Sequence, residues 1–150
     1  MREFPSLGAL AEAVGQHLGY SDWLDADRKR VDLFADATGD HQWIHVDPER
    51  AAAGPFKRTI AHGFLTLSLV PVLVSEVYRV AGVRMAVNYG LNKVRFPAPL
   101  PVGSRVRAGV ELAEVTPVDG GAQVVARVTV EVEGAAKPCC VAETVARLYS

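Results

Sequence analysis

Residues 62–80 read HGFLTLSLVPVLVSEVYRV, and this stretch decides the fold of the chain. Coiled into a helix, it presents apolar side chains on every side, and such a helix belongs at the centre of a fold. Its most apolar part, residues 64–74, is too short to span a bilayer and is interrupted by Thr66, Ser68 and Pro71. Proline removes one backbone hydrogen bond and predicts a bend. The sequence therefore predicts a buried central helix that the remaining chain must cover.

The second half of the chain alternates between apolar and polar residues, which is the pattern of half-buried strands. Asp119-Gly120-Gly121 predicts a hairpin turn, and residues 134–138 turn the chain again. Residues 83–96 predict either a strand pair or one long bent strand. The side chains expected to face inward are Val106, Ala108, Val110, Leu112, Val124, Ala126, Val128, Val130, Val132, Cys140, Ala142, Thr144, Ala146 and Leu148. We expect an α+β domain in which a curved antiparallel sheet wraps around the long central helix.

The first half of the chain predicts shorter helices. Apolar residues recur at helical spacing from Leu7 to Leu18, and Gly19 is expected to end that helix. Ser21 or Asp25 could cap the next helix. That second helix is expected over residues 29–38 with Gly39 as its stop, and a third begins at the Asp47-Pro48 cap and runs through residues 51–53.

Composition limits what the chain can be. Its 150 residues fit one domain, residues 1–150, with a sizeable core. With 16 basic and 17 acidic residues the formal net charge is -1, and no long basic run points to nucleic acid. Cys139 and Cys140 are adjacent and so unsuited to a mutual disulfide, and the N-terminus does not resemble a signal peptide. We expect a cytoplasmic protein that binds neither nucleic acid nor membrane.

Asp40 and His45 lie in the motif GDHQWIHVD, residues 39–47, directly after the expected helix end. On a helix the two would point to different faces, so we expect a loop that turns both toward one point. Histidine titrates near neutrality, and a neighbouring carboxylate shifts its pKa further into the range useful for proton transfer. The two residues therefore fit a general acid/base pair around one water. The alternative is structural: Asp40 caps a turn, and His45 is a satisfied polar residue.

Gly63 stands at the start of the apolar helix, directly after His62. A glycine there lets a substrate approach the backbone closely, and its free N–H at the positive end of the helix dipole has the geometry of an oxyanion hole. The alternative is a glycine needed only for packing between helix and sheet.

Histidines are grouped in this region, yet none of the spacings typical of zinc sites occurs, so we expect no metal.

These motifs together resemble a known family. Residues 34–73, FADATGDHQWIHVDPERAAAGPFKRTIAHGFLTLSLVPVL, resemble the signature of the MaoC-like (R)-specific enoyl-CoA hydratases, also called hydratase 2. The family pattern is close to G-D-x-N-P-x-H-x-D followed by I-A-H-G. Gln42-Trp43 replaces Asn-Pro, which is similar to the NodN-like branch, as is the run from Tyr89 to Arg107, YGLNKVRFPAPLPVGSRVR.

The resemblance implies a hotdog fold and a homodimer whose sheets join edge to edge. It implies a hydro-lyase that adds water to a trans-2-enoyl-CoA to give the (R)-3-hydroxyacyl-CoA, reversibly. By the match to the motif, Asp40 and His45 become the catalytic pair and Gly63 the oxyanion-hole donor. We expect His45 to be the base and Asp40 the proton donor, and the reverse assignment is the alternative. No cofactor is implied, because coenzyme A, or a carrier protein in its place, enters with the substrate.

The substrate-binding residues expected by this interpretation are Gln42, Trp43, His62, Lys93 and Arg95. Candidates for binding the coenzyme A phosphates are Lys93, Arg95, Lys57 and Arg58. Two other functions remain open. A hotdog thioesterase would need a carboxylate that activates water at the carbonyl instead of at C3. A non-catalytic acyl-thioester-binding dimer would use the same pocket without chemistry.

Overall fold

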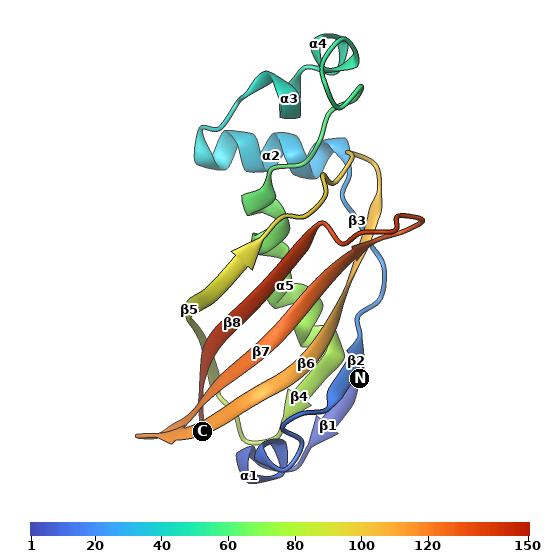
Figure 1. Cartoon of the computed structure of the whole chain (residues 1–150). Coiled ribbons are helices and arrows are strands. Elements are labelled where there is room, and N and C mark those ends of the chain that lie inside the picture. Colours follow the sequence, from blue (N-terminus) through green and yellow to red (C-terminus); the bar gives the residue numbers. More distant parts are fainter.

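The central helix α5 (Gly63–Val77) packs along the inner face of a six-stranded antiparallel sheet (Figure 1). The computed structural model describes all 150 residues. Leu65, Leu69, Leu73 and Val77 are buried along α5, and the helix continues through Pro71 without interruption. The predicted buried helix is confirmed, but its predicted end near residue 80 is wrong. The chain leaves the helix after Val77, because the next three residues pair as a strand.

The sheet has the strand order β2-β6-β7-β8-β5, and a short β3 also pairs with β6. Its members are β2 (His17–Tyr20), β3 (Leu24–Asp25), β5 (Met85–Arg95), β6 (Arg105–Val118), β7 (Gly121–Val132) and β8 (Cys140–Tyr149). Of the predicted inward residues, all but Thr144 and Ala146 are buried, and those two are partly buried. Of residues 83–96, Met85–Arg95 form one strand, β5, with two register shifts and a single sheet partner. The alternation of the sequence therefore identifies the inner face of the sheet.

The N-terminal segment differs from its prediction. Helix α1 (Leu7–Ala11) stops early, and Leu18 and Gly19 lie in β2, which pairs with β6 across a register shift. Beside it, β1 (Arg2–Phe4) and β4 (Tyr78–Val80) form a small parallel pair. The helical spacing of residues 7–18 was outweighed by hydrogen bonds to β6, a contact that local spacing cannot reveal.

Three helices close the end of the sheet where α5 begins (Figure 1). Helix α2 (Arg28–Thr38) ends at Gly39, whose φ of 78° is the left-handed conformation that glycine adopts readily. Asp27 caps it, so the predicted caps Ser21 and Asp25 are wrong: both pair with β6 instead. Helix α4 (Pro48–Ala52) has the predicted cap at Asp47. Helix α3 (Trp43–Val46) stands where a loop was predicted.

The outer face of the sheet carries ion pairs between neighbouring strands. Arg105 pairs with Glu133, Arg107 with Glu131, and Glu111 with Arg127. None of the helices combines the length and apolar character that crossing a membrane requires.

The core makes a test of the central helix possible. Leu73 is fully buried on α5, so Leu73→Ala should lower the free energy of unfolding by about 2–5 kcal/mol through lost burial and a residual cavity. The neighbouring Val72 is 45% exposed, and Val72→Ala should change it by no more than about 0.5 kcal/mol. Urea unfolding of both variants measures the difference, and equal losses would contradict the packing described.

Candidate active site

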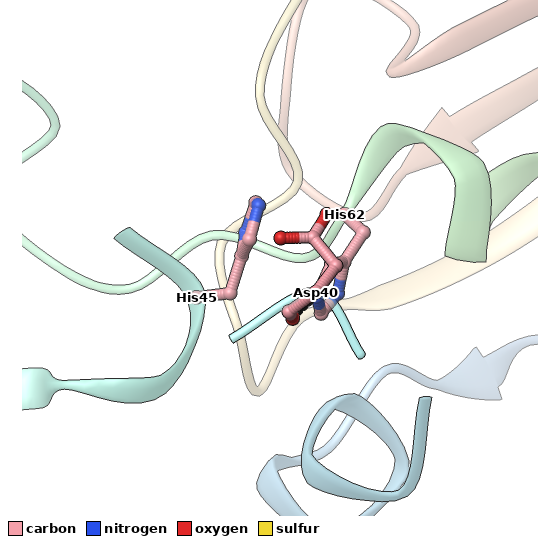
Figure 2. Close-up of side chains that lie close together, drawn as sticks. All are labelled: Asp40, His45 and His62. Carbon is pink, nitrogen blue, oxygen red and sulfur yellow. Dashed lines mark hydrogen bonds between the residues drawn. The ribbon is translucent and has the colours of Figure 1, made fainter. Parts of the chain in front are cut away.

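Asp40, His45 and His62 meet at the end of the sheet that α2, α3 and α4 close, and Figure 2 shows their side chains together. Asp40 lies in the turn after α2, His45 on α3, and His62 directly before α5. One side-chain nitrogen or oxygen of each lies within 4.8 Å of those of the other two. The sequence predicted the meeting of Asp40 and His45. The structure adds His62 as a third member.

His45 is buried, with 6% of its surface exposed, and its Nδ1 lies 2.7 Å from the backbone oxygen of Ile60. A carbonyl oxygen can only accept, so Nδ1 carries the proton and Nε2 keeps a lone pair. Burial lowers the pKa of His45 below its ordinary value of 6.5, although the bond to Ile60 and the charge of Asp40 act in the other direction. His45 is therefore neutral near pH 7, with Nε2 ready to accept a proton.

His62 is 2% exposed, and its Nε2 lies 2.9 Å from the backbone oxygen of Asp40. By the same argument Nε2–H donates, which holds the Asp40 turn against the start of α5. The other nitrogen, Nδ1, is buried and has no hydrogen-bond partner. The ring stacks on His45 at 3.9 Å between centroids and touches Phe34 on another side. The predicted substrate-binding role of His62 stays a prediction, and its anchoring of Asp40 is what the geometry shows.

The Asp40 side chain is exposed and lies close to the two rings (Figure 2). Its Oδ1 accepts one long hydrogen bond, 3.4 Å, from the backbone N–H of Gln42. Gln42 itself is the residue before α3, and its side chain does not cap that helix. The carboxyl group of Asp40 thus keeps most of its hydrogen-bonding capacity for a ligand.

Arg28 is a positioning residue that the sequence analysis missed. Its Nη2 donates to the backbone oxygen of His45 at 2.5 Å, and its Nη1 to the hydroxyl of Thr59 at 3.2 Å. Asp32, one turn along α2, binds the same guanidinium. The spacing of Arg28 and Asp32 was visible as an i,i+4 pair, but the link to His45 spans 17 residues and leaves no local pattern.

Gly63 is the first residue of α5, and its N–H donates to no group of the chain. The first N–H groups of a helix lack partners within it and carry its positive end. A Cβ at this position would lie 3.1 Å from the ring of Phe96, so glycine keeps that ring close. Both residues line an apolar pocket of about 300 Å³ that also reaches Ile60. The pocket therefore lies at the start of α5, and Ile60, whose backbone oxygen accepts from His45, is part of its wall.

Trp43, Lys93 and Arg95 have no hydrogen bond, ion pair or ring contact with Asp40, His45 or His62. The Trp43 ring lies under the guanidinium of Arg50 and leaves no room for a Cβ at Gly54. Lys93 and Arg95 are exposed on β5, opposite residues of β8. Trp43 thus packs α3 against α4, and the substrate-binding roles of all three stay predictions.

Two further cavities, of about 280 and 360 Å³, share Val70 and Pro71 of α5, Asn88 of β5 and Thr144 of β8. Together they form an elongated cleft between one face of α5 and the strands β5 and β8. Most of its lining near β4 is hydrophobic. The cleft suits an apolar chain that lies along the helix.

Comparison with known proteins shows similarity over nearly the whole chain. The family model described as MaoC like domain matches residues 9–134. The 3-hydroxyacyl-thioester dehydratase Z of Mycobacterium tuberculosis is 62% identical over 148 residues, covering 98% of each chain. The nodulation protein N of Rhizobium leguminosarum bv. viciae is 47% identical, covering 91% of this chain and 87% of that one. An (R)-hydratase from A. caviae involved in PHA biosynthesis superposes with a TM-score of 0.73 at 26% identity, covering 90% and 96%.

The neutral state of His45 predicts a dependence of stability on pH. The unfolded chain binds a proton at His45 near pH 6.5, while the folded chain does so only at lower pH. The free energy of unfolding should therefore fall as the pH drops below about 6.5, until folded His45 is protonated as well. His45→Gln should lack this contribution. Urea unfolding of both proteins at several pH values measures it, and parallel pH profiles would contradict the buried neutral ring.

Proposed function

Because the chain belongs to the MaoC-like dehydratase family and is a hydro-lyase, we propose that it hydrates a trans-2-enoyl thioester to the (R)-3-hydroxyacyl thioester and catalyses the reverse dehydration. The predicted hotdog fold and the resemblance to the NodN-like branch are confirmed. One observation carries the proposed chemistry. His45, whose Nε2 keeps a lone pair, lies together with Asp40 and His62, and Gly63, the residue after His62, has a free N–H at the start of α5.

The first step is the attack of water on C3. A water held between the two side chains loses a proton to Nε2 of His45 while its oxygen bonds to C3. The lone pair of His62 Nδ1, which has no partner in the chain, accepts the second hydrogen of this water. The C2=C3 electrons move toward the thioester carbonyl, whose oxygen gains negative charge. The N–H of Gly63, at the positive helix end, stabilises that charge.

The second step restores the carbonyl group. The proton held by His45 passes to the Asp40 carboxylate, and Asp40 delivers it to C2. One water is consumed, and both side chains return to their starting states. Dehydration runs through the same positions in reverse. Addition of water changes no net oxidation state, so the proposed reaction calls for no redox cofactor, and coenzyme A or a carrier-protein pantetheine enters as part of the substrate.

The cleft along α5 suits the acyl chain. It extends from Leu67 and Ser68 to Tyr78, a span of about 16 Å along the helix axis at 1.5 Å per residue.

A second copy of the chain is the proposed partner. Strand β5 pairs only with β8, and its free edge carries exposed apolar side chains, Met85, Val87, Tyr89 and Leu91. Such an edge is normally covered.

The reducing cytoplasm is the proposed compartment. Cys139 and Cys140 are buried free thiols, and burial raises the pKa of each, to about 12 and about 11. Thiols of this kind stay unreactive, which fits a protein that forms no disulfide.

Substitution of the proton-transfer pair tests the proposed reaction. Asp40→Asn and His45→Gln should each lower the hydration rate of crotonyl-CoA and of longer trans-2-enoyl-CoAs by about a hundredfold or more. His41→Gln is the matched control, because His41 lies in the same turn but is exposed and pairs with Asp36. Loss of the enoyl absorbance measures the reaction, and circular dichroism checks the fold.

Release of free coenzyme A in the same assay would instead identify a thioesterase. Tight binding of enoyl-CoA without turnover would identify an acyl-binding protein. Wild-type rates in either variant would place the chemistry on other residues.

The proposed dimer is tested by light scattering. The wild-type mass should be twice the chain mass of 16.1 kDa. The double variant Val87→Glu/Tyr89→Glu puts charge on the free edge of β5 and should shift the mass toward one chain. Leu33→Glu, at an equally exposed apolar residue of α2, should leave it unchanged. A wild-type protein that is monomeric at micromolar concentration, or an unshifted double variant, would contradict this interface.

A further inference from the structure

We propose that the protein selects long acyl chains over short ones, and that Tyr78 sets the upper limit of chain length at the far end of the cleft along α5. The identity of the ligand rests on the proposed function, in which the thioester carbonyl lies at the N–H of Gly63. The course of the cleft and the residues that end it follow from the structure alone.

One face of α5 leads from Gly63 to Tyr78. Leu67, Val70 and Val74 line the two cavities of the cleft. They follow Gly63 at the positions i+4, i+7 and i+11, which lie above one another on a helix, and Tyr78 comes at i+15, directly after the helix end. A ligand whose carbonyl oxygen accepts the N–H of Gly63 can therefore extend along one side of α5 as far as Tyr78.

The length of this face fits a long acyl chain. The 15 residues of α5 extend about 22 Å along the helix axis at 1.5 Å per residue. A fully extended peptide gains about 3.5 Å over three backbone bonds, so an extended hydrocarbon chain gains roughly 1.2 Å per bond. The face of α5 therefore matches an acyl group of roughly 16 to 18 carbons.

The far end of the cleft is lined by Tyr78, Val80 and Val83. Burial raises the pKa of Tyr78 above its ordinary value of 10.0, so its hydroxyl group stays neutral. Arg79 also lines this end, but its guanidinium group pairs with Glu3 at 2.6 Å. The end of the cleft presents no unpaired charge, and it suits the methyl terminus of a chain.

Phe4 is a positioning residue for Tyr78. Strand β1 pairs only with β4, and Arg2 lies opposite Tyr78 in that pair. The rings of Phe4 and Tyr78 meet edge to face at 6.3 Å between centroids. Phe4 is buried but does not line the cleft, so it supports the Tyr78 ring from outside. The N-terminal strand thus holds in place the residue that ends the cleft.

The selectivity follows from the burial of methylene groups. Each CH₂ moved from water into an apolar cleft strengthens binding about fourfold, so affinity rises with chain length until the cleft is full. A longer chain meets the Tyr78 ring and must bend out into water, where further methylenes gain nothing.

The first experiment compares the hydration of crotonyl-CoA and trans-2-hexadecenoyl-CoA. For the wild type, kcat/KM should be about tenfold or more higher for the longer thioester, through a lower KM. Ala146 of β8 lines the cleft, and Ala146→Phe fills it, so the ratio of the two kcat/KM values should fall about tenfold or more. Val141→Phe is the matched control: Val141 is 38% exposed on the same strand and does not line the cleft, so the ratio should stay unchanged.

The second experiment moves the limit in the other direction. Wild-type kcat/KM should fall from trans-2-hexadecenoyl-CoA to trans-2-docosenoyl-CoA. Tyr78→Ala should raise the ratio of docosenoyl to hexadecenoyl kcat/KM about fivefold or more, and Phe4→Ala should raise it less. Tyr78→Phe keeps the ring and should behave like wild type, because the ring and not the hydroxyl group ends the cleft.

A wild-type kcat/KM that does not rise with chain length would overturn the proposal. So would an unchanged ratio in folded Ala146→Phe or Tyr78→Ala, and either variant alone decides the question if the other does not fold. A changed mass of Ala146→Phe in light scattering with an unchanged ratio would show that a second copy fills the cleft instead.

Calorimetry with hexadecanoyl-CoA, which has no double bond to hydrate, separates this proposal from the proposed function. A protein without hydratase activity that binds hexadecanoyl-CoA, and binds it more weakly in Ala146→Phe, would refute only the hydratase. An active hydratase with the same chain-length profile in every variant would refute only the limit at Tyr78.

Discussion

The rest of the structure depends on the burial of a helix that is apolar on every side. Helix α5 is stable only when surrounded, and the curved sheet and the helices at its end provide the cover. Burial fixes where the helix begins, and the residues just before it cannot move independently. Ile60, His62 and Gly63 thus present a carbonyl, an imidazole and a free N–H at one place. The hydrophobic core positions the polar site.

Backbone carbonyls then determine the protonation pattern of that site. Ile60 and Asp40 each accept an N–H from a buried imidazole, which leaves one lone pair on each ring. Desolvation and the neighbouring His62 both disfavour the charged form of His45, and Arg28 adds positive charge nearby. Together these effects lower the pKa of His45 by more than the Asp40 carboxylate and the hydrogen bond to Ile60 raise it. A neutral imidazole results, and its Nε2 keeps a lone pair.

The sequence predicted those features that leave a local pattern. Inner strand faces and the central helix follow from periodicity, and the ends of α2 and α4 follow from Gly39 and Asp47. The pairing of β2 with β6 and the short α3 escaped prediction, because distant contacts stabilise them. In the site, the motif predicted that Asp40 and His45 would lie close together. It could not reveal that His62 anchors the Asp40 turn or that Arg28 supports His45, since both contacts join residues far apart in sequence.

Under the proposed function, the cleft along α5 would link substrate choice to assembly. One of its walls is β5, through Asn88 and Leu91, and β5 is also the free edge of the sheet. A second copy paired at that edge would restrain the same strand that borders the acyl chain. Substitutions at the edge would then alter chain-length preference as well as dimerisation, although they lie far from Asp40 and His45 in sequence. Under the proposed function, substrate choice would depend on this wall, and proton transfer would depend on Asp40 and His45 at the start of α5.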